Sequence, residues 1–266
     1  MKRFGLAFVT FLFCLAPVFA QDWAQQILLK SPRHREFVKV QYGARTVTAV
    51  IVYPEVKDKA PAILVIHEIY GLSDWVQTVA DQLAANGYIA IIPDLLSGMG
   101  PGGGGTSAFA PADVTSAVSG LPPDQVTADL NAVADYVKKL PAANGKLAVA
   151  GFCWGGGQSF RFATNRSDLS AAFVFYGTPP HDVTKITAPV YGFYGGNDAR
   201  VTATVPAAIE AMKAAGKKYE PVTYDGAGHG FMRDGMDPGS TSTTHAANIL
   251  AHDQAWQRWL AILKTM

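Results

Sequence analysis

Apolar residues form short continuous runs that alternate along the chain with longer helical patterns. Runs such as APAILVIHE at 60–68 and YIAIIPD at 88–94 predict strands that are buried on both faces of a parallel sheet. Segments with apolar residues three and four positions apart, such as 74–88 and 124–140, predict helices between them. Further strands are expected at 36–42, 45–54, 146–152, 171–177, 189–198 and 219–226, and further helices from the glycine run after 152 to Thr164, at 204–216 and at 244–265.

This alternation predicts an α/β fold. Its core is one open, mostly parallel, doubly wound sheet with helices on both faces. The first two strands, 36–42 and 45–54, are expected to form an antiparallel pair. Because no linker, internal repeat or second domain interrupts the pattern, residues 21–266 are predicted to form a single domain.

Residues 97–123 break the pattern, because they are rich in glycine, proline, serine and alanine. This composition is typical of a surface insertion. The segment also follows the end of a predicted strand, where doubly wound folds bind their ligands, so it could equally be a lid. The sequence leaves both interpretations open.

The first 20 residues predict a secretory signal peptide. Lys2 and Arg3 precede a run of almost wholly apolar residues up to Phe19, and small residues around Ala20 supply a cleavage position. We therefore expect an exported protein, periplasmic or secreted, with no membrane association after cleavage.

The charge balance does not favour a polyanionic partner. The chain carries 22 basic and 21 acidic side chains, and loss of Lys2 and Arg3 with the signal peptide changes its formal net charge from +1 to −1. We therefore expect no nucleic-acid partner.

Cys153 is the only cysteine of the mature chain, which excludes an internal disulfide. It lies in GFCWGGG at 151–157, where a predicted strand becomes a helix. The spacing Gly151-x-Cys153-x-Gly155 is that of a nucleophile elbow with sulfur in place of oxygen, and the helix N-terminus favours a thiolate and an oxyanion. A cysteine that is merely packed in a core does not need glycine on both sides, so a nucleophile is favoured.

A nucleophilic thiol needs a base and a group that orients the base. Asp198 lies in YGGNDARV and His229 in GAGHGFM, each directly after a predicted strand. The order nucleophile, acid, histidine is that of α/β-hydrolases, and all three side chains are expected at the same edge of the sheet. His67 and Glu68 form part of a zinc-motif pattern, but no second histidine follows at helical spacing, so no metal and no cofactor is expected.

Four segments, HEIYGL, GFCWGGG, GGNDARV and AGHGF, resemble the dienelactone hydrolase (carboxymethylenebutenolidase) family of the α/β-hydrolase superfamily. The resemblance extends over nearly all of residues 36–264. It implies an α/β-hydrolase fold and a triad of Cys153, Asp198 and His229. It also implies hydrolysis of small esters or lactones through an acyl-thioenzyme intermediate.

The same resemblance implies roles for further residues. Glu68 matches the family glutamate that interacts with the resting thiol and helps to generate the thiolate. The backbone N–H groups of Ile69 and Trp154 match the family's oxyanion hole, and Arg233 matches an arginine that contacts the substrate carboxylate. Tyr176 is also expected to contact the substrate.

One position departs from the family pattern. Better-known members carry a second carboxylate-binding arginine just after the segment that here ends in Leu96, Ser97 and Gly98. The departure puts dienelactone itself in doubt as the substrate. If strong carboxylate selectivity survives the loss of Arg233, another basic group, such as Arg200 or Arg161, shapes the pocket.

The alternative function, from another class, is a non-hydrolytic ligand-binding or thiol-redox protein on the same scaffold. A redox role needs a partner thiol, and with none in the mature chain only mixed disulfides or oxidation remain. We therefore expect a hydrolase that acts as a monomer on a small-molecule ester or lactone.

Overall fold

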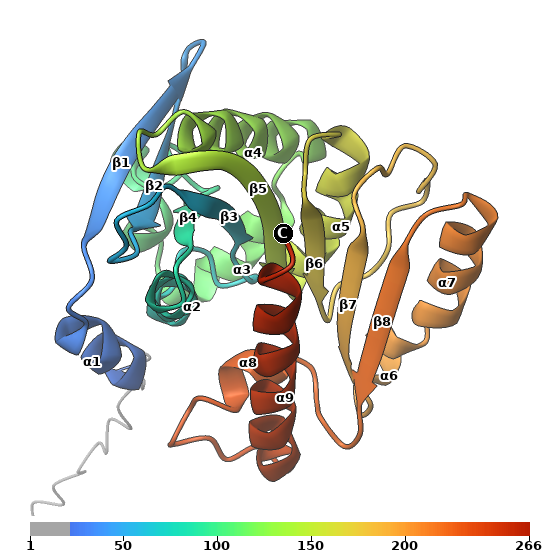
Figure 1. Cartoon of the computed structure of the whole chain (residues 1–266). Coiled ribbons are helices and arrows are strands. Elements are labelled where there is room, and N and C mark those ends of the chain that lie inside the picture. Colours follow the sequence, from blue (N-terminus) through green and yellow to red (C-terminus); the bar gives the residue numbers. More distant parts are fainter. Residues whose placement is uncertain (1–21) are drawn as a thin grey trace, which may run out of the picture.

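The structure is a computed structural model that describes residues 22–266, which fold around one eight-stranded sheet (Figure 1). The predicted signal peptide and its cleavage position lie outside the described residues. The strands are β1 Arg35–Tyr42, β2 Arg45–Val52, β3 Ala60–Ile66, β4 Ile89–Pro93, β5 Ala143–Phe152, β6 Ala171–Phe175, β7 Val190–Gly195 and β8 Tyr219–Tyr224.

The sheet is mixed at one end and parallel elsewhere. Its strand order is β1-β2-β4-β3-β5-β6-β7-β8. β2 pairs antiparallel with β1 and β4, and every other neighbouring pair is parallel. Parallel neighbours need crossover connections, which is why helices alternate with strands along the chain. The predicted α/β class, with its antiparallel opening pair, is confirmed.

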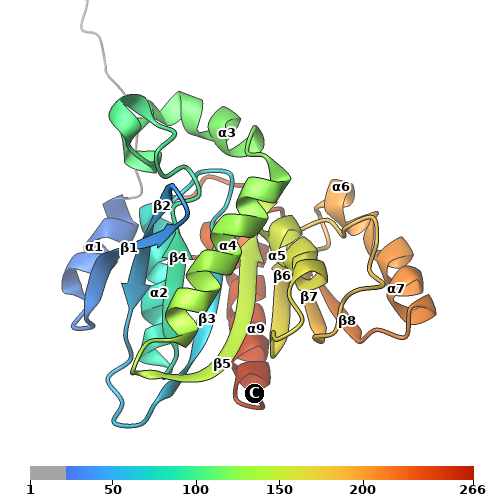
Figure 2. The same cartoon turned by 90° about the horizontal axis from the view of Figure 1, so that it is seen from above.

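Helices cover both faces of the sheet (Figure 2). Apolar side chains of α3, α4, α5 and α7 pack into one core, and those of α1, α2, α8 and α9 pack into a second core on the opposite face. The helices are α1 Asp22–Lys30, α2 Asp74–Ala85, α3 Pro111–Ser119, α4 Pro123–Lys138, α5 Trp154–Asn165, α6 Ala199–Thr202, α7 Val205–Ala214, α8 Phe231–Asp234 and α9 His245–Leu263, with 3₁₀ turns η1 Pro101–Gly103 and η2 Thr106–Ala108.

The apolar runs of the central strands are explained by these two cores. Successive side chains of a strand point to opposite faces. In β3, Ile63 and Val65 therefore lie in one core while Leu64 and Ile66 lie in the other.

Four helices, α1, α3, α6 and α8, were not expected from the sequence. α3 lies inside the segment 97–123, which composition describes as a loop. Its residues Val114 and Val118 occupy successive turns and are buried in the core, and Pro111 begins the helix. The apolar pair and the proline are a local helix signal that the glycine-rich surroundings obscure.

The carboxyl ends of the parallel strands meet at one edge of the sheet. Glu68 follows β3, Cys153 follows β5, Asp198 follows β7 and His229 follows β8. This edge brings together residues that are far apart in the sequence, as in other doubly wound folds.

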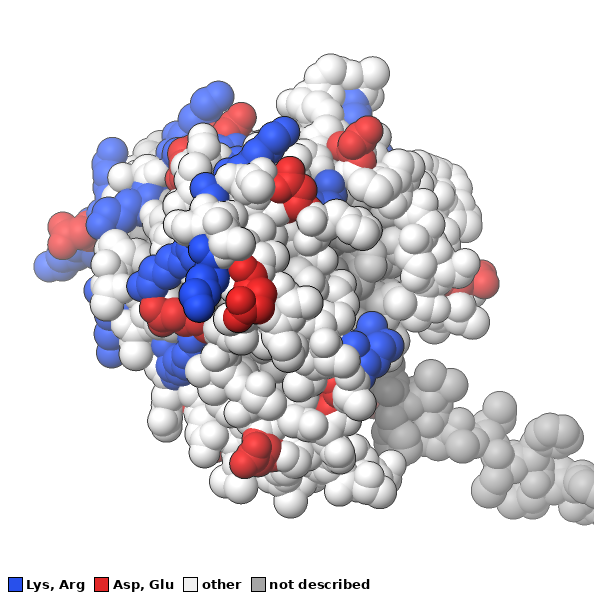
Figure 3. All heavy atoms as spheres, turned by 90° about the vertical axis from the view of Figure 1, so that its right-hand side faces the viewer, with Lys and Arg blue, Asp and Glu red and all other residues white. Residues whose placement is uncertain are grey.

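Charged side chains of both signs are interspersed on the face that carries α7 and β8 (Figure 3). Ion pairs of the described surface include Lys138 with Asp168 at 2.5 Å and Arg166 with Asp135 at 2.8 Å. Within residues 22–266, no helix combines the length and the apolar character needed to cross a bilayer.

Candidate active site

Cys153 lies in the sharp turn between β5 and α5. Its backbone has φ +56° and ψ −117°, and its N–H donates to the carbonyl of Phe175 at 3.0 Å. The turn requires glycine on both sides. A Cβ on Gly151 would lie 1.9 Å from the carbonyl oxygen of Gly155, and one on Gly155 would lie 2.3 Å from that of His67. The elbow that the sequence predicts is therefore present, with the thiol at the N-terminus of α5.

His229 and Asp198 extend from the thiol in one hydrogen-bonded chain. The Nε2 of His229 lies 3.0 Å from the Sγ of Cys153, and its Nδ1 lies 2.5 Å from the Oδ2 of Asp198. Asp198 is buried and begins α6, where its Oδ1 accepts from the N–H of Val201 at 3.4 Å. Asn248 of α9 supports the histidine loop by accepting from the N–H of Gly228 at 2.7 Å.

These contacts change the titration of His229. Burial lowers its pKa, but hydrogen bonds and charge interactions with Cys153 and Asp198 outweigh that effect and raise the pKa to about 9. The imidazole in this arrangement therefore holds its second proton at neutral pH. The N–H of the protonated Nε2 then faces the Cys153 sulfur.

Two backbone N–H groups beside the thiol have no acceptor among residues 22–266. They belong to Ile69, which follows β3, and to Trp154, the first residue of α5. Both residues line the same cavity as Cys153, which has a volume of about 510 Å³. Free donors at this position are suited to hold a negatively charged oxygen.

Glu68 contacts Arg233 and Tyr176 in this structure. Its Oε2 accepts from the Nε of Arg233 at 2.9 Å, and its Oε1 accepts from the hydroxyl of Tyr176 at 3.2 Å. The carboxylate is buried, and no hydrogen bond within residues 22–266 joins it to the thiol. The resemblance places this glutamate beside the resting thiol, so the structure shows a different arrangement of the same residue.

Only one of the two expected substrate contacts, Tyr176 and not Arg233, lines the cavity. The guanidinium of Arg233 is held by Glu68 and stacks over the ring of Tyr70 at 5.1 Å, and it is not among the residues that line the cavity. Tyr176 does line the cavity, with its ring centroid 5.1 Å from that of His229. The cavity lining also contains two basic side chains, Arg161 and Arg200.

The segment 97–123 does not line the cavity but braces the loop that carries Ile69. The carboxylate of Asp94 accepts from the N–H of Thr106 at 2.8 Å and from its hydroxyl at 2.7 Å. The same hydroxyl accepts from the N–H of Leu72 at 3.1 Å. Sequence reasoning did not single out Asp94 or Thr106. The position of Asp94, at the carboxyl end of β4, was the available signal.

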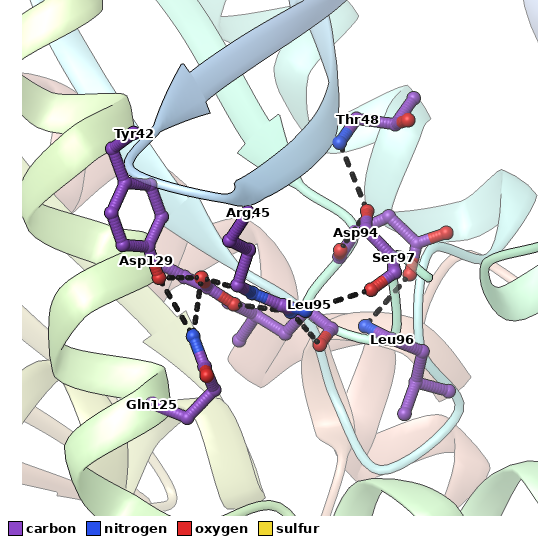
Figure 4. Close-up of polar contacts among 9 residues, drawn as sticks. All are labelled: Tyr42, Arg45, Thr48, Asp94, Leu95, Leu96, Ser97, Gln125 and Asp129. Carbon is purple, nitrogen blue, oxygen red and sulfur yellow. Dashed lines mark hydrogen bonds and ion pairs between the residues drawn. The ribbon is translucent and has the colours of Figure 1, made fainter. Parts of the chain in front are cut away.

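A second cluster fixes the start of this segment, at Ser97, to the sheet (Figure 4). Arg45 donates to both carboxylate oxygens of the buried Asp129, at 2.6 and 2.7 Å, and to the carbonyl of Ser97 at 3.0 Å. Tyr42 and Gln125 also donate to Asp129, at 2.5 and 2.9 Å. The buried carboxylate is fully hydrogen-bonded, as a buried charge must be.

Known proteins resemble this chain in both sequence and fold. The dienelactone hydrolase family matches residues 47–266. A putative carboxymethylenebutenolidase of Salmonella typhimurium is 34% identical over 225 residues, which are 78% of each chain. The carboxymethylenebutenolidase of Pseudomonas putida is 27% identical, with 80% of this chain and 92% of that protein covered.

A solved structure of a related protein has a similar fold. The structure of a putative dienelactone hydrolase from Klebsiella pneumoniae superposes with a TM-score of 0.73 at 26% identity, covering 86% of this chain and 97% of that one. Sequence and fold therefore agree. The chain belongs to the dienelactone hydrolase family of hydrolases, which has the α/β-hydrolase fold.

Proposed function

We propose that this hydrolase cleaves small carboxylic esters or lactones through an acyl-thioenzyme, with Cys153 as nucleophile, His229 as acid and base, and Asp198 as the group that orients His229. The observation that carries the proposal is the continuous contact from Asp198 through His229 to the Cys153 sulfur. Its spacing matches the nucleophile, base and orienting group of acyl-transfer enzymes.

Acylation begins when the Cys153 thiolate adds to the substrate carbonyl carbon. The carbonyl electrons move onto the oxygen, which the N–H groups of Ile69 and Trp154 stabilise. When the carbonyl re-forms, the C–O bond to the leaving alcohol breaks, and the alkoxide takes the Nε2 proton of His229. The products are a thioester on Cys153 and a neutral histidine. In a lactone, the alcohol stays attached to the acyl group.

Deacylation reverses these roles. Neutral His229 removes a proton from water, and the hydroxide adds to the thioester carbon in the same oxyanion hole. Collapse breaks the C–S bond, releases the carboxylic acid and restores the thiolate beside the protonated imidazole. None of these steps uses a metal ion or a cofactor.

Glu68 is proposed to act in this cycle by positioning rather than by contact with the reacting atoms. Its carboxylate joins Arg233 to Tyr176, whose ring packs against the ring of His229. We further propose that the protein is exported and works as a monomer on a small molecule.

The test is to let the protein react with an activated ester and to stop the reaction during turnover. Mass spectrometry then determines whether Cys153 carries the acyl group. Cys153→Ala should remove this adduct and lower kcat at least about a thousand-fold without loss of the fold. Full turnover in Cys153→Ala would overturn the proposal. A wild-type protein that hydrolyses no ester or lactone but whose thiol oxidises reversibly would favour the redox alternative.

A further inference from the structure

His67 is a buried histidine beside the candidate active site, and no step of the proposed cycle uses it. It follows β3 directly, and it is fully buried. Burying a polar ring is costly unless its nitrogens are hydrogen-bonded and it carries no unpaired charge. The contacts of the two ring nitrogens therefore indicate what the ring does.

Only one of these nitrogens is hydrogen-bonded. The Nδ1 of His67 lies 2.7 Å from the carbonyl oxygen of Glu68, which can only accept, so the ring proton is assigned to Nδ1. Nε2 is buried and has no hydrogen-bond partner among residues 22–266. Burial lowers the pKa of His67 and outweighs the hydrogen bond to Glu68 and the charge of Asp94, which both raise it. The ring is therefore neutral at neutral pH.

The Nδ1 hydrogen bond fixes the peptide group that contains the first proposed oxyanion donor. The carbonyl of Glu68 and the N–H of Ile69 belong to one planar trans peptide, in which they point in opposite directions. The same carbonyl also accepts from the N–H of Gly71 at 3.1 Å. Because the carbonyl is held towards His67, the N–H of Ile69 points away from that ring, and Ile69 lines the cavity.

The ring of His67 also contacts the residue that carries the second donor. It stacks on the indole of Trp154 with a centroid separation of 5.7 Å and an interplanar angle of 14°. The backbones are equally close, since a Cβ on Gly155 would lie 2.3 Å from the carbonyl oxygen of His67. One residue therefore contacts both segments that carry the two N–H groups.

We propose that His67 is a positioning residue that keeps the N–H groups of Ile69 and Trp154 directed at one oxyanion. The proposal deepens the proposed function and rests on it. His67 does not line the cavity, so it acts through the Glu68 carbonyl and the indole. Donors that are already in place when negative charge develops stabilise it most, and a hydrogen bond to the carbonyl also strengthens the N–H of the same peptide.

Loss of the Nδ1 donor should slow catalysis without a change at the thiol. His67→Leu should lower kcat for an activated ester such as p-nitrophenyl acetate about ten- to a hundred-fold, with little change in KM. The reason is that acylation and deacylation both place negative charge on the oxygen that these donors stabilise. His67→Asn should recover most of the lost kcat, because its amide N–H can occupy the position of Nδ1.

Two probes separate the oxyanion donors from the thiol. A trifluoromethyl ketone adds to the Cys153 thiolate and its carbonyl electrons move onto the oxygen, so its Ki should rise in His67→Leu by about the factor that kcat loses. Iodoacetamide alkylates the same sulfur as iodide leaves, and no charge develops on its carbonyl oxygen. The alkylation rate of Cys153 should therefore be the same in His67→Leu and in the wild type.

His252→Leu is the matched control. His252 also has a buried Nε2 without a hydrogen-bond partner in the described chain, and its ring stacks on Trp256 at 6.5 Å. It lies on α9 and does not line the cavity, so its replacement should leave kcat, the ketone Ki and the alkylation rate unchanged.

A second pair of variants gives a result even if His67→Leu does not fold. Glutamine carries its amide at the position of Nε2 rather than Nδ1, so His67→Gln should be slow where His67→Asn is active. Equal kcat in these two variants would show that the hydrogen bond to Glu68 does not matter and would overturn the proposal.

The possible failures are distinguishable. If the wild type is active and His67→Leu keeps its kcat, the positioning role is wrong while the proposed function stands. The same holds if alkylation of Cys153 slows in parallel with kcat, because His67 would then act on the thiol. If the wild type hydrolyses no ester or lactone, the proposed function itself fails.

Discussion

Cys153 keeps a backbone conformation that L-amino acids rarely adopt, with φ +56° and ψ −117°. Such a residue costs of the order of 1–3 kcal/mol and persists only where the surrounding structure imposes it. Here the packing of Gly151 against Gly155, and of Gly155 against β3, imposes it. The strained turn directs the thiol into the cavity. The backbone strain at Cys153 lowers the stability of the fold at the residue on which the proposed chemistry depends.

The strain can be measured by comparing two variants that both lack the thiol. Cys153→Gly should be more stable than Cys153→Ala by about 1 kcal/mol, because relief of strain exceeds the entropy that glycine adds to the unfolded chain. Urea denaturation of the two inactive proteins gives this difference. Ala207→Gly in α7 is the control and should destabilise by about 1 kcal/mol. If glycine destabilises at both positions, Cys153 is not strained.

His229 makes stability depend on pH. Its pKa in the folded protein is about 9, against 6.5 for an unperturbed histidine, so the folded state binds more protons between these values. The stabilisation is therefore fully present below about pH 6.5 and is lost as the pH rises through 9. The Tm of the wild type should fall more steeply over this interval than that of His229→Gln. Parallel Tm profiles for the two proteins would contradict the assignment.

At the scale of elements, the segment 97–123 is tied to the rest of the fold by a helix and by hydrogen bonds. It contains α3, which contributes Val114 and Val118 to the core, and it is held at one end by Ser97. Nine residues further on, Thr106 links Asp94 to the backbone of Leu72. Gly71 lies against this threonine so closely that a Cβ would come within 2.5 Å of its hydroxyl. The segment thereby fixes the loop that presents the N–H of Ile69.

Loss of the Thr106 hydroxyl should therefore affect catalysis from outside the cavity. Thr106→Val removes one hydrogen bond to Asp94 and one from Leu72, and we expect about 1–3 kcal/mol of destabilisation and a lower kcat with little change in KM. Thr106→Ser should restore both. Ser119→Ala, which removes an exposed hydroxyl of α3 from the same segment, should change neither. An unchanged kcat in Thr106→Val would show that the brace is only structural.

At the scale of the whole molecule, the sequence predicts those features that depend on a local pattern of residues. Buried strands, the β1–β2 pair and the elbow at Cys153 follow from apolar runs and from glycine spacing, and each is present. The partners of Glu68 and Arg233 could not be predicted, because 165 positions separate the two and only the folded sheet edge brings them together. The sequence offered Arg161 only as an alternative to Arg233, and its place in the cavity lining also depends on the folded sheet edge.

The order of the strands also determines which of the proposed catalytic residues depends on an edge strand of the sheet. Cys153 extends from β5 in the interior, whereas His229 follows β8, which pairs on one side only and is partly exposed. Edge strands open at lower free energy than central ones. Local opening of β8 would separate the imidazole of His229 from the sulfur of Cys153 while both cores stay intact. Mild heating should therefore cause a reversible loss of activity at a temperature below that of global unfolding.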